Sequence, residues 1–176
     1  MRIVADDRVP FPREVVYRTY RDRLVELVPF LPNVREIEVR ERKDEDDAVR
    51  LVNVWHAKAE IPAVARSVLR PEMLAWTDRA VWREAEWTTE WRIETHAFTE
   101  AVTCAGRNEF VAQGDATVIR IRGDLRIDLR QVRAVPRLLA GTIGPVVEKF
   151  VVAMITPNLS KVSRGIEKLL TRERDG

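Results

Sequence analysis

The hydrophobic positions of this chain change period twice, from helical spacing to alternation and back to helical spacing. After Arg2–Val9, a first segment of strand length, apolar residues at helical spacing predict two short helical segments that end at Pro29 and Pro32. Pro12 suits the first turn of the first helix, where no hydrogen bond needs its missing N–H. The apolar positions of these two segments are Val15, Val16, Tyr20, Leu24, Leu27 and Val28.

The middle of the chain alternates between apolar and polar residues, which predicts six consecutive antiparallel strands. The charged run 41–47 is expected at a hairpin tip, and Gly114-Asp115 is expected to form the last turn. Ile61–Pro71 fits either a short helix or a loop across the sheet edge. The predicted strands are Val34–Arg42, Val49–Ala57, Met73–Arg83, Trp87–His96, Ala101–Gln113 and Ala116–Leu129.

From Thr142 to Leu170 the period is again helical and predicts one long helix, in which Pro157 should cause a kink or a break. Residues 171–176 are polar, and we expect a frayed tail. Only this helix has an apolar stripe broad enough to cover one face of the sheet. The chain is therefore predicted to be a single α+β domain over residues 1–176. A curved antiparallel sheet of about seven strands, in the order β-α-α-β6-α, would wrap around the C-terminal helix and leave space for a ligand.

This order resembles the START-like, or Bet v 1-like, superfamily, which includes polyketide cyclases and lipid-transport proteins. The opening Val9-Pro10-Phe11-Pro12-Arg13-Glu14-Val15-Val16-Tyr17 is similar to the family's P-x-x-V-(Y/F) signature. Val132-Arg133-Ala134-Val135-Pro136, a glycine-containing turn and Glu148 are similar to the passage into the last helix of bacterial members. The resemblance covers nearly the whole chain. It implies a helix-grip fold with a hydrophobic cavity, and it transfers no active site, because the superfamily shares no fixed catalytic residues.

Composition excludes several classes of function. The 30 basic residues are nearly balanced by 28 acidic ones, so no nucleic-acid partner is expected. A single cysteine excludes an internal disulfide framework. The longest charge-free run, Phe150–Ser160, is too short for a membrane span of about 20 residues. The first residues lack the apolar region of a signal peptide, so we expect a cytoplasmic protein.

Nucleotide-dependent and triad enzymes are also disfavoured, because the chain has neither a phosphate-binding glycine loop nor a G-x-S-x-G elbow. His56 and His96 do not match the spacing of a zinc motif, and a zinc site would need unusual help from carboxylates. We therefore predict no metal and no cofactor.

The ligand-binding candidates are bulky or polar residues that alternation places on the inner face of the sheet. Tryptophan offers a large apolar contact and one N–H donor, and a buried polar group without a partner costs roughly 1–3 kcal/mol. Two alternatives remain open: the rings fill a large core, and each polar group bonds locally to backbone. The predicted ligand-binding residues are Asn53, Trp55, Trp76, Trp82, Trp87, Thr89, Trp91, Asn108, Phe110, Phe150 and Met154.

Three functions are compatible with this pattern. The leading hypothesis is a protein that binds or carries a hydrophobic or amphipathic, lipid-like small molecule. The second is a polyketide cyclase, aromatase or dehydratase in which Asp78, its pKa raised beside Trp76 and Trp82, assists proton transfer. An exposed Asp78-Arg79 pair is the alternative interpretation of that residue. The third is a protein-interaction module with a filled core, which a cavity below roughly 300 Å³ would favour.

Overall fold

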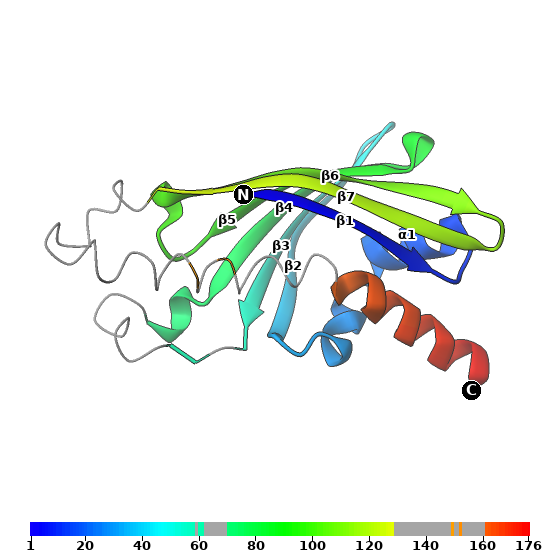
Figure 1. The fold of residues 1–176 in the computed structure, drawn as a ribbon, viewed down its shortest axis with the longest axis horizontal. Helices are drawn as coiled ribbons and strands as arrows, with labels where there is room; N and C mark the ends of the chain where they lie inside the picture. Colours follow the sequence, from blue (N-terminus) through cyan, green and yellow to red (C-terminus); the bar gives the residue numbers. More distant parts are fainter. Residues whose placement is uncertain (59, 62–69, 129–148, 150–151, 153–160) are drawn as a thin grey trace, which may run out of the picture.

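The computed structural model describes residues 1–58, 60–61, 70–128, 149, 152 and 161–176. Figure 1 shows these elements along the chain. They are β1 (Arg2–Val9), α1 (Arg13–Asp22), η1 (Leu24–Phe30), β2 (Val34–Asp44), β3 (Val49–Ala57), η3 (Pro71–Met73), β4 (Ala75–Arg83), η4 (Glu84–Glu86), β5 (Thr88–Thr95), η5 (Thr99–Ala101), β6 (Val102–Gln113) and β7 (Ala116–Ile127). A helix over residues 161–175, here called the C-terminal helix, follows.

The strands form one seven-stranded sheet in the order β1-β7-β6-β5-β4-β3-β2, and every neighbouring pair is antiparallel. Consecutive hairpins account for β2 to β7, whereas β1 joins the sheet by pairing with β7. The predicted α+β helix-grip architecture of about seven strands is therefore confirmed.

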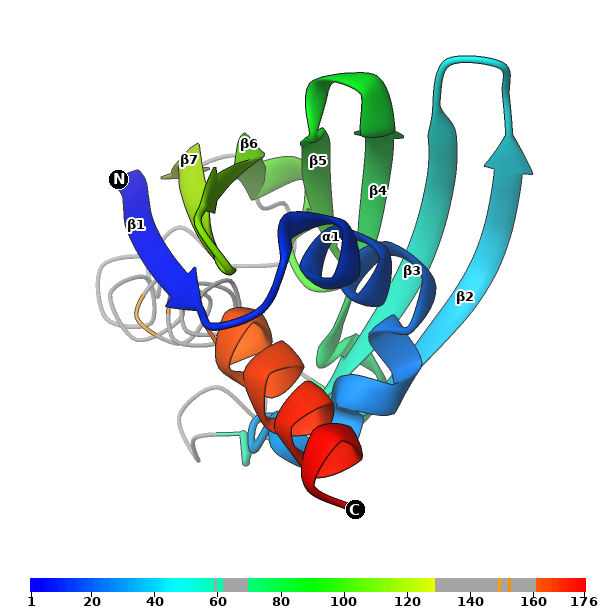
Figure 2. The same cartoon turned by 90° about the vertical axis from the view of Figure 1, so that its right-hand side faces the viewer.

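The sheet curves around α1 and the C-terminal helix, which both lie on its concave side (Figure 2). We call this side the inner face and the opposite side the outer face. The C-terminal helix buries Val162, Ile166 and Leu169, as its apolar stripe predicted. It continues to residue 175, so residues 171–175, where we expected a frayed tail, are helical. The predicted kink at Pro157 lies outside the described residues.

Alternation predicted the faces of the strands better than their ends. Met73 belongs to η3 and not to β4, and Trp87 precedes β5 in a left-handed conformation with φ of 55°. Two register irregularities interrupt β2, between Val34 and Glu36 and between Val39 and Glu41. Bulges of this kind change the local pairing without leaving a clear mark in the hydrophobic pattern.

A pair of glycines lets Trp91 approach the centre of the sheet. Gly106 on β6 is the register partner of Gly123 on β7. A Cβ at Gly106 would lie 2.4 Å from the Arg122 carbonyl oxygen and 2.4 Å from the Trp91 ring. A side chain at Gly123 would also meet that ring, at 2.8 Å. The two glycines therefore fix where the Trp91 indole packs.

Candidate functional site

A cavity of about 40 Å³ lies on the inner face of the sheet. Alternate residues of β4 and β5 form most of its wall, because a period of two places them on the same side. Tyr20 of α1 and Val162 of the C-terminal helix complete the wall from the helices that pack on this face (Figure 2). The described lining residues are Tyr20, Trp55, Trp76, Asp78, Ala80, Trp82, Thr89, Trp91, Ile93, Asn108 and Val162.

Asp78 is the one charged side chain among these described lining residues. Its register partner on β3 is Asn53, and the two side chains are hydrogen-bonded. Burial raises the pKa of Asp78 from 3.8 to about 7, and the hydrogen bond with Asn53 opposes this rise. The direction of this shift agrees with the one predicted from the sequence. Asp78 lines the cavity while the exposed Arg79 pairs with Glu94, so the two do not form the exposed pair that was the alternative. Near neutral pH this carboxyl can either hold or release a proton.

Asn108 organises a second polar group in the cavity. The indole Nε1–H of Trp91 donates to Asn108 Oδ1 over 2.9 Å. Asn108 is also hydrogen-bonded to the Tyr20 hydroxyl. Burial raises the pKa of Tyr20, so this hydroxyl remains protonated at neutral pH. The three side chains link β5, β6 and α1 through polar atoms inside an otherwise apolar core.

Several other polar atoms on the inner face have no hydrogen-bond partner among the described residues. They belong to β3, β4 and β5, and their side chains are at most 5% exposed. Each such atom costs about 1–3 kcal/mol unless water or a ligand satisfies it. These atoms are Asn53 Oδ1, Trp55 Nε1, Trp82 Nε1, Thr89 Oγ1 and Thr95 Oγ1.

The rings around the cavity also pack on one another. Trp55 and Trp76 are stacked with their centroids 5.5 Å apart. Trp82 meets the Tyr17 and Tyr20 rings edge-on, at 5.2 Å in both cases. Both sequence-based interpretations of the tryptophans therefore hold in part, because the same rings line the cavity and fill the core.

Not every predicted ligand-binding residue lies at the cavity. Asn53 is absent from the lining and is linked to it through its hydrogen bond with Asp78. Trp87 contacts the Tyr17 ring at 5.3 Å and the Arg13 guanidinium at 4.3 Å, and it is absent from the lining. Trp87 therefore packs against the core of the inner face without lining the cavity, and it is the residue before β5, with a φ of 55°. Phe110 packs against Tyr17 in the core, at 5.0 Å, and does not line the cavity either. Phe150 and Met154 lie outside the described residues.

Sequence reasoning missed Tyr20, Ala80, Ile93 and Val162 as lining residues. Tyr20 carried a usable signal, because a hydroxyl within the apolar stripe of a helix needs a buried partner.

Cys104 points inward and is fully buried, and burial raises its thiol pKa to about 12. It is therefore no nucleophile at neutral pH. Among the described residues, no helix has the length and apolar character to cross a membrane.

Comparison with known proteins identifies the fold. No family model matches the chain, and no curated protein matches it. Among solved structures, it is similar to the Zhui aromatase/cyclase from Streptomyces, with a TM-score of 0.68, 15% identity and coverage of 98% of this chain and 94% of that one. A Thermus thermophilus protein, TTHA0849, gives a TM-score of 0.65 at 19% identity, covering 96% and 95% of the two chains.

A START superfamily protein from Mycobacterium smegmatis is also similar, with a TM-score of 0.53, 15% identity and 97% coverage of both chains. Norcoclaurine synthase from Thalictrum flavum gives 0.59 at 12% identity, covering 97% of this chain and 86% of that one. The resemblance seen in the sequence is thus confirmed as a shared helix-grip fold, the fold of the START-like superfamily.

Proposed function

We propose that the protein binds an amphipathic small molecule whose polar group occupies the inner-face cavity. The observation that carries this proposal is the set of buried polar atoms without partners around Asp78. A core that serves only for stability would replace such groups by apolar ones, because the exchange is neutral or stabilising. The START-like fold supports the same proposal, since a sheet gripping a helix offers a sheltered space.

The polar atoms indicate the chemistry of the bound group. Among the lining residues, Trp55 and Trp82 each offer one N–H donor, and the Thr89 hydroxyl can donate or accept. Asn53 Oδ1 adds an acceptor behind the lining, beside Asp78. A hydroxyl or carbonyl group on the ligand complements this set. The apolar part of the ligand would contact the stacked indoles of Trp55 and Trp76.

The size of the cavity constrains the proposal. At about 40 Å³ it holds a few water molecules or one small polar group, whereas cavities for drug-sized ligands measure roughly 300 Å³ or more. By the criterion set from the sequence, this volume favours the filled-core interaction module. A lipid-like ligand therefore requires the cavity to enlarge on binding, and the test must detect binding directly.

The first experiment is native mass spectrometry of the purified protein, followed by organic extraction of any bound compound. We expect a stoichiometric small molecule, or else quenching of tryptophan fluorescence by decanoate, cholesterol or menadione. An empty protein that none of the three probes quenches would overturn the proposal and leave the interaction module.

A matched pair of threonine variants locates the binding site. Thr89→Val removes an unpartnered hydroxyl, so it should preserve or raise the stability of the ligand-free protein while weakening ligand binding severalfold. Thr117→Val is the control, because the Thr117 hydroxyl already donates to the Phe11 carbonyl over 2.7 Å. The control should lose stability and bind the ligand as wild type does. Equal ligand affinity in both variants would place the ligand elsewhere.

A second candidate function is acid–base catalysis on a polyketide-like substrate in the same cavity. It is favoured by Asp78, whose pKa of about 7 lets the carboxyl exchange a proton near neutral pH. The Asp78→Asn variant separates the two functions. A pure carrier forms no product, and its variant should still bind the ligand. An enzyme should still bind its substrate in this variant and lose turnover. Unchanged turnover in this variant would exclude Asp78 from catalysis.

A further inference from the structure

The outer face of the sheet brings together residues that the sequence keeps apart. His56 on β3 pairs in register with Ala75, and the Ala75 carbonyl accepts the backbone N–H of His96 over 2.9 Å. Because both residues are linked to Ala75, the two histidines of the chain lie at the same end of the sheet. The His96 ring contacts Thr77 Oγ1 at 2.9 Å, on the outward side of β4.

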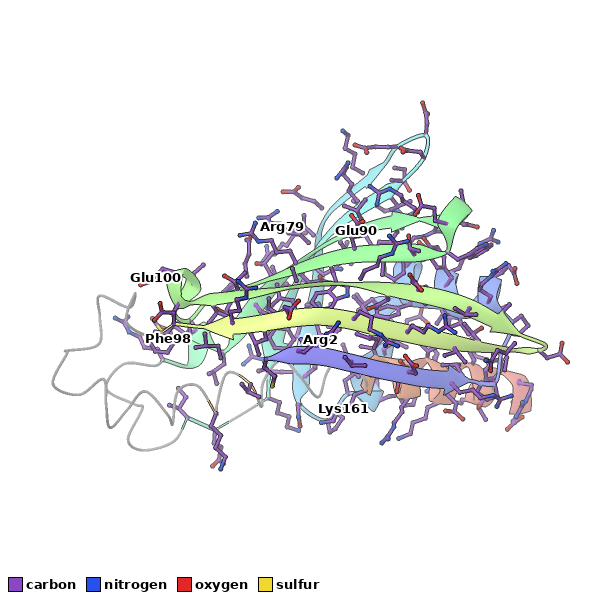
Figure 3. All side chains as sticks on the ribbon, turned by 45° about the horizontal axis from the view of Figure 1, so that its top comes forward. Arg2, Arg79, Glu90, Phe98, Glu100 and Lys161 are labelled. Atoms are coloured by element: carbon purple, nitrogen blue, oxygen red, sulfur yellow. The ribbon has the colours of Figure 1, made fainter. Side chains whose placement is uncertain are left out.

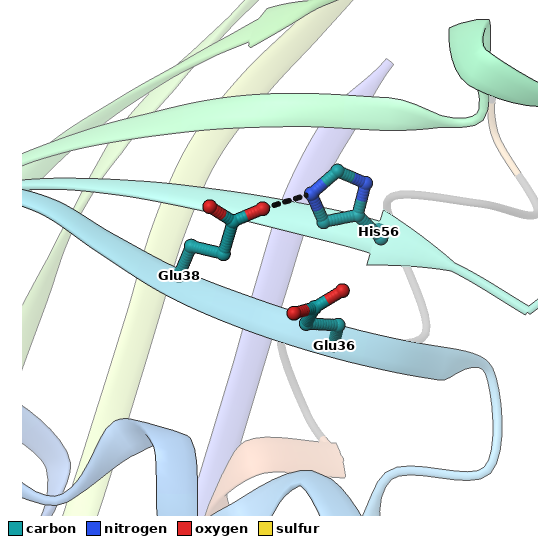
Figure 4. A group of neighbouring side chains, drawn as sticks. All are labelled: Glu36, Glu38 and His56. Carbon is teal, nitrogen blue, oxygen red and sulfur yellow. Dashed lines mark hydrogen bonds and ion pairs between the residues drawn. The ribbon is translucent and has the colours of Figure 1, made fainter.

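Two carboxylates from the neighbouring strand reach His56. The irregularity after Val34 places Glu36 directly opposite His56, and Glu38 follows two residues later on the same face. Glu38 Oε1 lies 2.8 Å from His56 Nε2 (Figure 4). One potential ligand atom from each of Glu36, Glu38 and His56 lies within 4.8 Å of the other two.

We propose that Glu36, Glu38 and His56 form a binding site for a divalent transition-metal ion, with Zn²⁺ as the preferred occupant. One imidazole nitrogen and two carboxylate oxygens suit zinc, whereas magnesium and calcium take oxygen ligands. The sequence spacing predicted no metal site because it contained no zinc motif; strand register supplies the carboxylates that such a site would need.

The surroundings of these residues favour a site with an open coordination position. The Arg40 guanidinium holds Glu38 Oε2 at 2.7 Å, which orients this carboxylate and leaves Oε1 toward His56. The side chains of His56 and Glu38 are 22% and 31% exposed, so water or an external ligand can reach the ion. Three protein ligands with one open position are typical of catalytic zinc sites.

This proposal is independent of the proposed ligand-binding function, because its residues lie on the opposite face of the sheet from the cavity. Filling the metal site requires no enlargement of the cavity, and an empty cavity would leave the metal proposal intact.

Calorimetric titration of the tag-free 176-residue chain with Zn²⁺ tests the site, and Co²⁺ absorption reports its coordination. We expect one equivalent of Zn²⁺, and binding at least about tenfold weaker in both His56→Ala and Glu36→Gln, since each variant removes one ligand. With Co²⁺ we expect ligand-field bands of a low-coordinate site that are lost in the same variants.

Glu90→Gln is the matched control, because Glu90 is an outer-face carboxylate paired with Arg83 at 3.4 Å (Figure 3). It should bind Zn²⁺ within about twofold of wild type, as expected for a residue outside the site. Circular dichroism of each variant verifies folding, and Glu36→Gln tests the proposal if His56→Ala fails to fold. Wild-type affinity in either folded ligand variant, or no Zn²⁺ binding to wild type at micromolar concentration, would overturn the proposal.

Discussion

The two faces of the same strands differ in how their polar groups are satisfied. On the inner face of β3–β5, polar atoms of Asn53, Trp55 and Thr89 are buried without partners among the described residues. On the outer face, charged side chains pair with one another in solvent, as Arg79 does with Glu94 at 3.3 Å. Buried unsatisfied groups cost about 1–3 kcal/mol each, while exposed ion pairs contribute about 0–1 kcal/mol. The polar groups that destabilise the fold are therefore those of the inner face, and a ligand bound there would offset this cost by hydrogen-bonding to them.

Removing an inner-face ring should cause the largest change. Trp91→Ala deletes a buried indole, its hydrogen bond to Asn108 and its packing against the two glycines, and should lower the free energy of unfolding by about 3–5 kcal/mol. Urea unfolding followed by circular dichroism measures this loss. Trp87→Ala is the control and should lose less than half as much, because Trp87 is only partly buried at the rim. Equal losses would contradict the distinction between the two rings.

The buried carboxyl predicts an unusual dependence on pH. Because the pKa of Asp78 rises from 3.8 to about 7 on folding, the folded state holds a proton that the unfolded state has lost between these values. The contribution of Asp78 to the free energy of unfolding should therefore fall as the pH rises from about 4, and become constant above about 7. At roughly 1.4 kcal/mol per pKa unit, the full shift corresponds to a loss of about 4 kcal/mol in the free energy of unfolding. Asp78 is only half-buried, and solvent screening reduces the expected loss to about 2–4 kcal/mol.

Urea unfolding of wild type and Asp78→Asn at pH 4, 6 and 8 measures this contribution. The asparagine variant cannot ionise, so it should gain stability relative to wild type as the pH rises. Parallel pH profiles for the two proteins would show that Asp78 is not held in a raised-pKa environment.

Adding a single methyl group should have opposite effects on stability at two glycines, Gly106 and Gly165. Gly106→Ala forces a Cβ to within 2.4 Å of the Arg122 carbonyl and should cost about 1–3 kcal/mol. Gly165→Ala, in the C-terminal helix, meets nothing closer than 3.7 Å and should stabilise the protein by up to about 1 kcal/mol through helix propensity. Thermal unfolding of both variants gives the comparison. A stable Gly106→Ala protein would mean that Trp91 can pack elsewhere.

The smallest effect is expected on the outer face. Arg79→Gln breaks the exposed pair with Glu94, and the free energy of unfolding should change by less than about 0.5 kcal/mol. The change should shrink further in about 1 M salt, because exposed charges are screened. Urea unfolding at low and high salt measures it, and a loss above about 1 kcal/mol would show that the outer face also carries stability.

The sequence by itself determined the order of elements, the number of strands and most inward positions. A residue period of two separates the faces of a strand, and a period of 3.6 marks the buried stripe of a helix. That information sufficed to place Trp55, Trp76, Asp78 and Asn108 on one face, and to predict a raised pKa for Asp78.

The tertiary structure decided which of these residues meet. The contact of Asp78 with Asn53, the approach of Tyr20 from α1 and the grouping of Glu36 with His56 depend on strand register and on packing between distant segments. Trp87 and Phe110 show the limit of alternation, because both pack against Tyr17 in the core and neither lines the cavity. Cavity volume likewise depends on how side chains interdigitate. Register, bulges and packing arise from non-local contacts, so the local pattern of the chain does not specify them.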